Sequence, residues 1–183
     1  GALDARLAAG DAPIAVALLD LRRFRAVNES LGYAVGDAVL QAVAGRLGDN
    51  GGSGSGASIA RLAADQFAVF ESLAPDDTPL AWGQRLLQRV ARPVELGSQL
   101  LDVTPVLGIA LAPQDAASAT ELLRCADLAC DLAKRRNLGC TAFGPETPRP
   151  GRERLSLLGE LQRALDEDQF RLVLQPKVGL RDR

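Results

Sequence analysis

Apolar residues recur along the chain with two periods, which together predict alternating strands and helices. Short apolar runs bounded by turn residues are typical of buried strands. Such runs occupy Ile14–Leu19, Ser58–Leu62, Gln66–Glu71, Val94–Leu96, Leu100–Leu111 and Cys140–Phe143. Apolar residues spaced by three or four positions predict intervening helices at residues 21–31, 35–47, 79–91 and 120–133. This order favours an α/β (α+β) fold in which helices flank a mixed central sheet.

Turn and capping residues mark several of the predicted boundaries. Thr78 followed by Pro79 is typical of a helix start, and Thr120 is expected to cap the last long helix. Gly97-Ser98 lies between two strand patterns and indicates a hairpin. Residues 48–58 are rich in glycine and serine and predict a flexible loop.

The composition changes after Phe143 and divides the chain into three parts. Residues 1–144 carry the alternating pattern, and residues 145–151 have the proline and glycine content of a linker. An amphipathic helix is expected at Arg152–Asp168 and a strand at Phe170–Gln175. Because a single strand cannot bury itself, residues 152–183 are interpreted as an interdomain helix and the truncated start of a second domain.

Composition narrows the possible classes of function. The chain is 47% hydrophobic with a formal net charge of −2, which argues against a nucleic-acid-binding or acidic-membrane surface. No apolar run approaches the roughly 18 residues of a membrane span, and no signal-peptide pattern opens the chain. Cys125, Cys130 and Cys140 lack metal-binding spacing and are expected to be buried thiols in a reducing cytoplasm. Because the chain has no histidine, any catalysis is expected to use carboxylates and a metal ion.

Two aspartates are candidate metal ligands. Asp20 closes the first predicted strand, and Asp65 lies in the tight turn before Gln66–Glu71. If the strands pair, both carboxylates lie at one edge of the sheet, where they would favour magnesium and a phosphate-bearing substrate. The alternative is that Asp20 only forms a turn.

The segment that begins at Asp20 resembles the first motif of diguanylate cyclases of the GGDEF family. It matches the family pattern at Asp20, Phe24, Asn28, Gly32, Gly36 and Asp37. The resemblance implies that Asp20 binds magnesium or manganese, that Phe24 belongs to the nucleotide site, and that the guanine base is held by Asn28 and Asp37. A carboxylate suits guanine because it accepts hydrogen bonds from N1–H and the exocyclic amine together. The alternative for Asn28 and Asp37 is capping of neighbouring helices.

A second resemblance lies in the last long helix. The segment Ala126-Asp-Leu-Ala-Cys-Asp-Leu-Ala-Lys134 is similar to a family helix whose lysine reaches the triphosphate, which implies that role for Lys134. The alternative is a solvated cation at a helix end. Leu138 replaces an arginine of the family, which removes a second phosphate ligand. Arg22 replaces a second acidic residue and is expected to place a cation beside the metal.

The motif that names the family, Gly-Gly-Asp/Glu-Glu-Phe, is altered at three of its five positions and occurs as Ala63-Ala64-Asp65-Gln66-Phe67. A two-residue hairpin turn needs positive φ, which alanine resists by about 1–2 kcal/mol per residue, so the alanines are expected to reshape the turn. Asp65 keeps the acidic third position, whereas Gln66 removes a negative charge.

The residues after the linker resemble the opening of an EAL phosphodiesterase domain, through Leu161–Leu165 and Phe170–Val178. The leading interpretation is a degenerate, catalytically inactive GGDEF domain, with a nucleotide-cyclase (palm-like) fold, from a tandem GGDEF–EAL protein of bacterial cyclic di-GMP signalling. It would regulate the attached EAL domain as a GTP-binding or dimerisation module. One alternative is an active cyclase that makes cyclic di-GMP from two GTP molecules in a homodimer. The other is an interaction module that binds no nucleotide.

Overall fold

The computed structural model describes residues 1–9, 13–48, 57–97, 99–148 and 163–173. The chain divides into two compact units, Gly1–Pro148 and Arg149–Arg183. The flexible loop predicted at residues 48–58 lies mostly outside the described residues.

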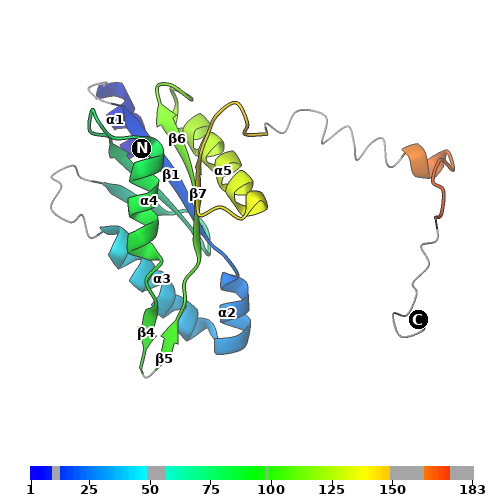
Figure 1. The fold of residues 1–183 in the computed structure, drawn as a ribbon, viewed down its shortest axis with the longest axis horizontal. Coiled ribbons are helices and arrows are strands. Elements are labelled where there is room, and N and C mark those ends of the chain that lie inside the picture. Colours follow the sequence, from blue (N-terminus) through cyan, green and yellow to red (C-terminus); the bar gives the residue numbers. More distant parts are fainter. Residues whose placement is uncertain (10–12, 49–56, 98, 149–162, 174–183) are drawn as a thin grey trace, which may run out of the picture. The chain divides into compact units, whose positions relative to one another are not determined.

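A mixed sheet forms the centre of the first unit, with strands in the order β2-β3-β1-β6-β7 (Figure 1). These strands are β1 (Ile14–Leu21), β2 (Ser58–Arg61), β3 (Gln66–Ser72), β6 (Pro105–Ala112) and β7 (Cys140–Ala142). β1 pairs antiparallel with β3 and β6, whereas β6 and β7 are parallel. A separate two-stranded ribbon consists of β4 (Val94–Leu96) and β5 (Gln99–Leu101). The predicted mixed central sheet is confirmed.

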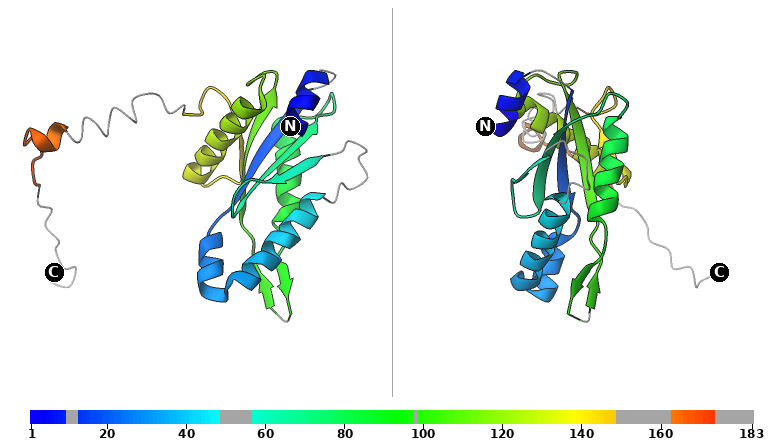
Figure 2. Two further views of the ribbon diagram at one scale, coloured as in Figure 1. Left: turned by 180° about the vertical axis from the view of Figure 1, so that it is seen from behind. Right: turned by 90° about the vertical axis from the view of Figure 1, so that its left-hand side faces the viewer.

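Helices cover both faces of this sheet. They are α1 (Ala2–Ala9), α2 (Phe24–Leu31), α3 (Tyr33–Gly48), α4 (Pro79–Val90) and α5 (Ala119–Arg136). α3 and α4 share one buried apolar cluster with the sheet, and α1 and α5 share a second cluster on the opposite face (Figure 2). β1 is buried along its whole length because both faces are covered. Its side chains alternate, so that Leu19 lies in the α3–α4 cluster and Leu18 in the α5 cluster.

Two strand boundaries differ from the sequence prediction. β1 continues to Leu21, so Asp20 lies inside the strand instead of after it. The single strand predicted at Leu100–Leu111 is wrong: β5 ends at Leu101, and β6 begins at Pro105. Proline has no amide hydrogen for a strand ladder, and it is tolerated as the first residue of a strand.

The helix caps are partly as predicted. Thr78 caps α4, because its Oγ1 accepts a hydrogen bond from the Ala81 amide at 3.2 Å. α5 is instead capped by Ser118, whose Oγ accepts from the Glu121 amide at 3.3 Å. Thr120, the predicted cap, lies within the first turn of the helix.

The second unit is described only at residues 163–173. The predicted helix Arg152–Asp168 lies mostly outside the described residues, although residues 163–166 are helical. The strand predicted at Phe170–Gln175 is wrong for residues 170–173, which form no strand. Leu172 and Val173 are 89% and 86% exposed, and a strand needs a pairing partner that the described residues do not supply.

The three cysteines are free thiols. Cys125 and Cys130 are buried, as predicted, whereas Cys140 is only partly buried. Burial raises the pKa of the Cys130 thiol to about 12, so this thiol stays neutral at physiological pH. It donates a weak hydrogen bond to the Val106 carbonyl, with Sγ and oxygen 3.7 Å apart.

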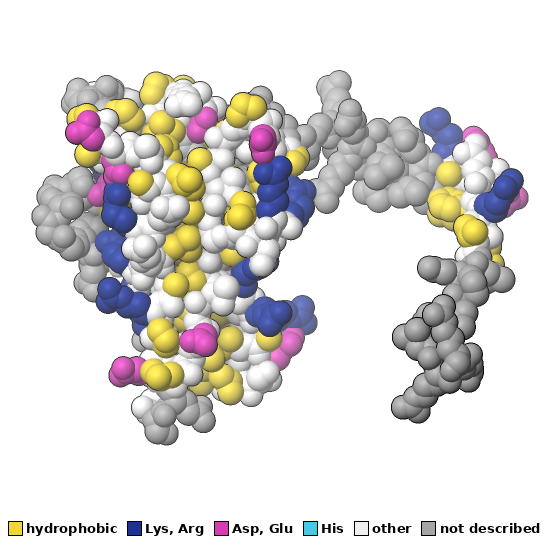
Figure 3. Space-filling view, viewed as in Figure 1, with side chains coloured by type: hydrophobic (Ala, Val, Ile, Leu, Met, Phe, Trp, Pro, Cys, Tyr) yellow, Lys and Arg dark blue, Asp and Glu magenta, His cyan; other side chains and the backbone are white. Residues whose placement is uncertain are grey.

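The outer surface of the first unit carries charges of both signs. Basic and acidic side chains both lie on the face shown in Figure 3. Among the helices that the structure describes, none has the length and apolar character needed to cross a membrane.

Gly108 allows α5 to lie directly against β6. A Cβ at this position would lie 2.0 Å from the Ala126 carbonyl oxygen and 2.1 Å from the Cys130 amide nitrogen. Both are backbone atoms of α5, so a side chain could be accommodated only if the helix moved. Gly108 therefore sets the distance between the sheet and the helical turn that precedes Lys134.

We expect Gly108→Ala to destabilise the fold by about 1–3 kcal/mol, the usual cost of overpacking. Gly45→Ala is the matched control, because Gly45 is an exposed glycine in α3 with no atom within 4 Å of an added Cβ. That substitution should be neutral or stabilise by up to about 1 kcal/mol. Urea unfolding measures both changes, and equal effects would contradict the role given to Gly108.

Candidate functional site

The sheet register brings Asp20 and Gln66 together at one end of β1. The two residues are direct partners in the β1–β3 pairing. Alternate residues of a strand share a face, so Asp20 follows Val16 and Leu18 onto the face that α5 covers. Gln66 lies on the same face because directly opposed residues point to the same side. Asp20 is only 8% exposed, and a carboxylate so buried needs partners.

Lys134 and Gln66 are those partners. Lys134, in the last turn of α5, donates from Nζ to Asp20 Oδ2 at 2.7 Å, and Gln66 Nε2 donates to the same oxygen at 3.2 Å. Burial alone would lower the pKa of Lys134, but the hydrogen bond to Asp20 and the surrounding negative charges outweigh it, and the pKa is raised. Lys134 therefore remains positively charged at neutral pH. Gln66 can donate because it is an amide, whereas an ionised glutamate could only accept.

Arg22 holds the end of α5 close to this cluster. Its Nη1 donates to Asn137 Oδ1 at 2.6 Å, and its Nη2 donates to the Lys134 carbonyl at 3.1 Å. The last carbonyl groups of a helix lack partners within the helix and carry partial negative charge, so a guanidinium is favourable there. Arg22 was expected to place a cation beside a metal at Asp20. In the structure, its guanidinium binds the helix end, and the cation that contacts Asp20 is Lys134.

The altered hairpin is a four-residue loop between β2 and β3. Neither Ala63 nor Ala64 has positive φ, in keeping with the cost of that conformation for alanine. Arg61 closes the loop by donating from Nε to the Ala63 carbonyl at 3.2 Å and from Nη2 to the Ala64 carbonyl at 2.9 Å. The Asp65 carbonyl accepts from the Leu21 amide at 3.1 Å, which places the backbone of Asp65 beside the end of β1.

The predicted guanine-binding residues lie at the corner between α2 and α3. A Cβ at Gly36 would lie 1.9 Å from Asn28 Oδ1 and 3.2 Å from the Phe24 ring, so this glycine lets Asn28 lie against the turn that carries Asp37. Neither Asn28 nor Asp37 forms a side-chain hydrogen bond or ion pair with another described residue, and neither caps a helix there. Both polar groups are therefore available to a ligand. Phe24 is 5% exposed, and its ring packs beneath the corner in the apolar cluster.

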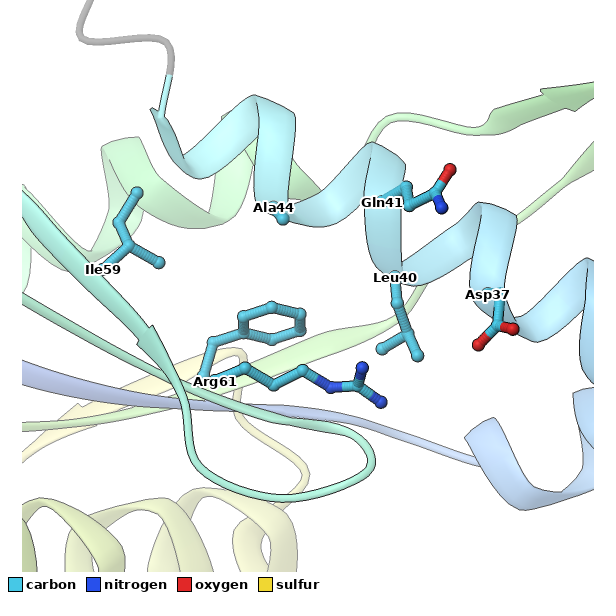
Figure 4. A pocket seen from close by; sticks show the side chains of 7 residues that line it. Asp37, Leu40, Gln41, Ala44, Ile59 and Arg61 are labelled. Atoms are coloured by element: carbon cyan, nitrogen blue, oxygen red, sulfur yellow. The ribbon is translucent and has the colours of Figure 1, made fainter.

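A cleft of about 350 Å³ opens between α3 and β2 (Figure 4). Its lining consists of Asp37, Leu40, Gln41, Ala44, Ile59, Arg61 and Phe67. Asp37 and Arg61 extend into it from the two walls (Figure 4). The sequence prediction included Asp37 and Phe67 but missed Leu40, Gln41 and Arg61. Leu40 and Gln41 follow Asp37 at the i+3 and i+4 positions of the predicted helix, so helical spacing could have identified both.

The residues at Asp20 do not fit a divalent cation as they stand. Magnesium and manganese need several oxygen ligands, but Asp20 Oδ2 already accepts from Lys134 and Gln66. Asp65 is a second carboxylate nearby, yet the described residues contain no group of three or more acidic, cysteine or histidine side chains that could hold a metal. Leu138, in the position of the family's phosphate-binding arginine, is 44% exposed and adds no charge.

Comparison with known proteins finds relatives over most of the chain. The family described as diguanylate cyclase, GGDEF domain, matches residues 2–139. The cyclic di-GMP phosphodiesterase NbdA of Pseudomonas aeruginosa is 33% identical over 171 residues. The bifunctional diguanylate cyclase/cyclic di-GMP phosphodiesterase MucR of the same organism is 34% identical over 170 residues. Each similarity covers 92% of this chain but only 22% and 24% of NbdA and MucR, respectively, so the chain spans less than a quarter of their length.

A solved structure shares the fold. The X-ray structure of an EAL/GGDEF domain protein from M. capsulatus is 33% identical and superimposes with a TM-score of 0.68. The similarity covers 78% of this chain and 94% of that one. The mixed sheet flanked by helices therefore has a counterpart in an experimentally determined domain.

The Asp20–Lys134 ion pair should contribute measurably to stability. We expect Lys134→Met to destabilise the fold by about 1–3 kcal/mol, because Asp20 would keep a nearly buried charge with only Gln66 as partner. The double variant Asp20→Asn/Lys134→Met should recover part of this loss. Urea unfolding of the wild type, both single variants and the double variant gives the coupling energy.

The exposed pair of Arg124 and Glu121 on the same helix is the control. Arg124→Met should change stability little, because solvent screens exposed pairs. A coupling energy near zero between Asp20 and Lys134 would contradict the ion pair described here.

Proposed function

The chain belongs to the GGDEF family of diguanylate cyclase domains, and from this premise we propose that it is a degenerate member that binds GTP without cyclising it. The observation that carries the proposal is the state of Asp20, whose carboxylate accepts hydrogen bonds from both Lys134 and Gln66. In this reading the domain is a regulatory module of a cyclic di-GMP signalling protein, located in the cytoplasm.

The positions of the polar groups support the proposed loss of catalysis. Cyclisation moves negative charge on a phosphate, which requires preorganised cations at the reacting atoms. Here the ammonium of Lys134 is bonded to Asp20, and the guanidinium of Arg22 is bonded to the end of α5. Leu138 supplies no charge where the family has an arginine. The groups that would stabilise a reacting triphosphate are therefore engaged elsewhere or replaced.

Retention of GTP binding is supported by the corner between α2 and α3. Asn28 and Asp37 lie close together without partners among the described residues, and Asp37 also lines the cleft with Arg61. The Asp37 carboxylate can accept from guanine N1–H and the exocyclic amine, and the Asn28 amide can both donate and accept. Phe24 and Gly36 contribute by supporting this corner.

We propose further that residues 152–183 begin an EAL domain, which this module regulates. The similarity to NbdA covers 92% of the chain and so extends beyond residue 139, where the GGDEF match ends. NbdA is named as a cyclic di-GMP phosphodiesterase, and MucR as a bifunctional diguanylate cyclase/cyclic di-GMP phosphodiesterase.

Calorimetric titration with GTP in the presence of magnesium tests the binding proposal. Asp37→Ala should weaken binding by at least about tenfold, because it removes charge-assisted hydrogen bonds to the base. Asp76→Ala is the matched control. Asp76 is exposed and lies shortly after Ser72 in the sequence. Ser72 pairs with Ile14, at the opposite end of β1 from Asp20. Replacing Asp76 should therefore leave the affinity for GTP unchanged.

The same protein, incubated with GTP and magnesium or manganese, should yield no cyclic di-GMP by chromatography. Formation of the product would favour the active homodimeric cyclase instead. Absence of GTP binding, together with a mass that rises with protein concentration, would favour a dimerisation module that takes no nucleotide.

A further inference from the structure

We propose that Lys134 and Gln66 have taken the place of a divalent cation at Asp20, so that this domain binds guanine nucleotide without magnesium. The inference rests on the proposed GTP binding for its nucleotide part. Its metal part stands on the contacts of Asp20 alone.

Both donors to Asp20 bind the same carboxylate oxygen. Lys134 Nζ lies 2.7 Å and Gln66 Nε2 lies 3.2 Å from Asp20 Oδ2. A hard cation bound to either oxygen of this carboxylate would lie close to the Lys134 ammonium, and the two positive charges would repel each other strongly. Because Asp20 is nearly buried, solvent screens that repulsion less than it would at the surface.

Both the main chain and the side chain of Lys134 bond to the end of β1. Its carbonyl accepts from Arg22 at 3.1 Å, and its ammonium donates to Asp20, two residues before Arg22. Arg22 also bonds Asn137, which ends α5 in a left-handed conformation. The end of α5 is thus tied to the end of β1, which keeps Lys134 beside Asp20.

Gln66, the residue opposite Asp20 in the sheet, carries a neutral amide. Its amide donates to Asp20, whereas a glutamate at this position would place a second negative charge opposite the first. A pair of facing carboxylates attracts a cation more strongly than a carboxylate that faces a neutral amide, because the amide adds no negative charge. Gln66 is therefore the residue that decides whether this site takes a metal or the lysine alone.

The test begins with manganese and no nucleotide. Titration of the 183-residue chain with Mn²⁺, followed by electron paramagnetic resonance of the free ion, should show no site in the wild type. In the double variant Gln66→Glu/Lys134→Gln, the first substitution adds a carboxylate opposite Asp20 and the second removes the ammonium group. Because both changes make the site more negative, this variant should bind Mn²⁺ at least about tenfold more tightly than the wild type. Gln66→Glu alone should give an intermediate gain. Circular dichroism confirms that each variant is folded.

Gln114→Glu is the matched control. Gln114 is exposed and follows Ala112, which pairs with Ile14 at the far end of β1, so the same charge is added away from Asp20. This variant should bind Mn²⁺ no better than the wild type. A manganese site in the wild type that is lost in Asp20→Asn, or no gain in the double variant, would overturn the proposal.

The nucleotide part is measured by calorimetry with GTP in EDTA and in magnesium. The wild type should bind with affinities that agree within about twofold, whereas Gln66→Glu/Lys134→Gln should bind more tightly with magnesium than with EDTA. A wild-type affinity that requires magnesium would overturn the inference but leave GTP binding intact. If GTP fails to bind in both buffers, the proposed function fails, and the manganese titration still decides whether Lys134 and Gln66 exclude the metal.

Discussion

The close packing of α5 against the sheet determines what can happen at Asp20. Gly108 permits backbone contact between β6 and the turn of α5 that contains Cys130, and one turn later Lys134 lies over the end of β1. Because side chains of β1 alternate between faces, Asp20 points to α5 and meets Lys134 at 2.7 Å. A buried carboxylate, a helix-end cation and a glycine at the point of contact thus form one connected arrangement.

Within this arrangement, the departures from the family motifs support one another. Gln66 donates to the carboxylate that Lys134 neutralises, and Arg22 satisfies the end of the helix that carries Lys134. Asp20 is nearly buried, so its carboxylate would be costly to leave without these donors. Together, these residues form a set of internal hydrogen bonds where the family resemblance implies a metal and phosphate site. The corner at Asn28 and Asp37, where we propose that guanine binds, is built from other elements, α2 and α3, and is separate from these contacts.

The fold could be predicted from the sequence because hydrophobic period and helix signals agree along residues 14–142. The predicted order of strands and helices is confirmed except that the strand predicted at Leu100–Leu111 is two strands, β5 and β6. The errors fall where local chemistry competes, as at Pro105 and at the choice between Ser118 and Thr120. For the site, the motif resemblance that begins at Asp20 identified Asn28 and Asp37, which lie together at the corner between α2 and α3. The motif gave no information on the hydrogen bonds of these side chains. That Lys134 binds Asp20, and that Arg22 binds the helix end, depends on the packing distance of α5, which no local pattern encodes. The strand predicted at Phe170–Gln175 is not formed at residues 170–173, because a strand needs a neighbouring strand and a local pattern does not show whether one is present.

Internal donors occupy Asp20 where the family resemblance implies a metal. A crystal structure of the chain grown with GTP and Mn²⁺, with anomalous diffraction measured at the manganese edge, tests whether they exclude the metal. We expect a guanine base between Asn28 and Asp37, no anomalous peak at Asp20, and Lys134 still bonded to Asp20. A manganese peak within coordination distance of the Asp20 carboxylate, with Lys134 displaced, would contradict it.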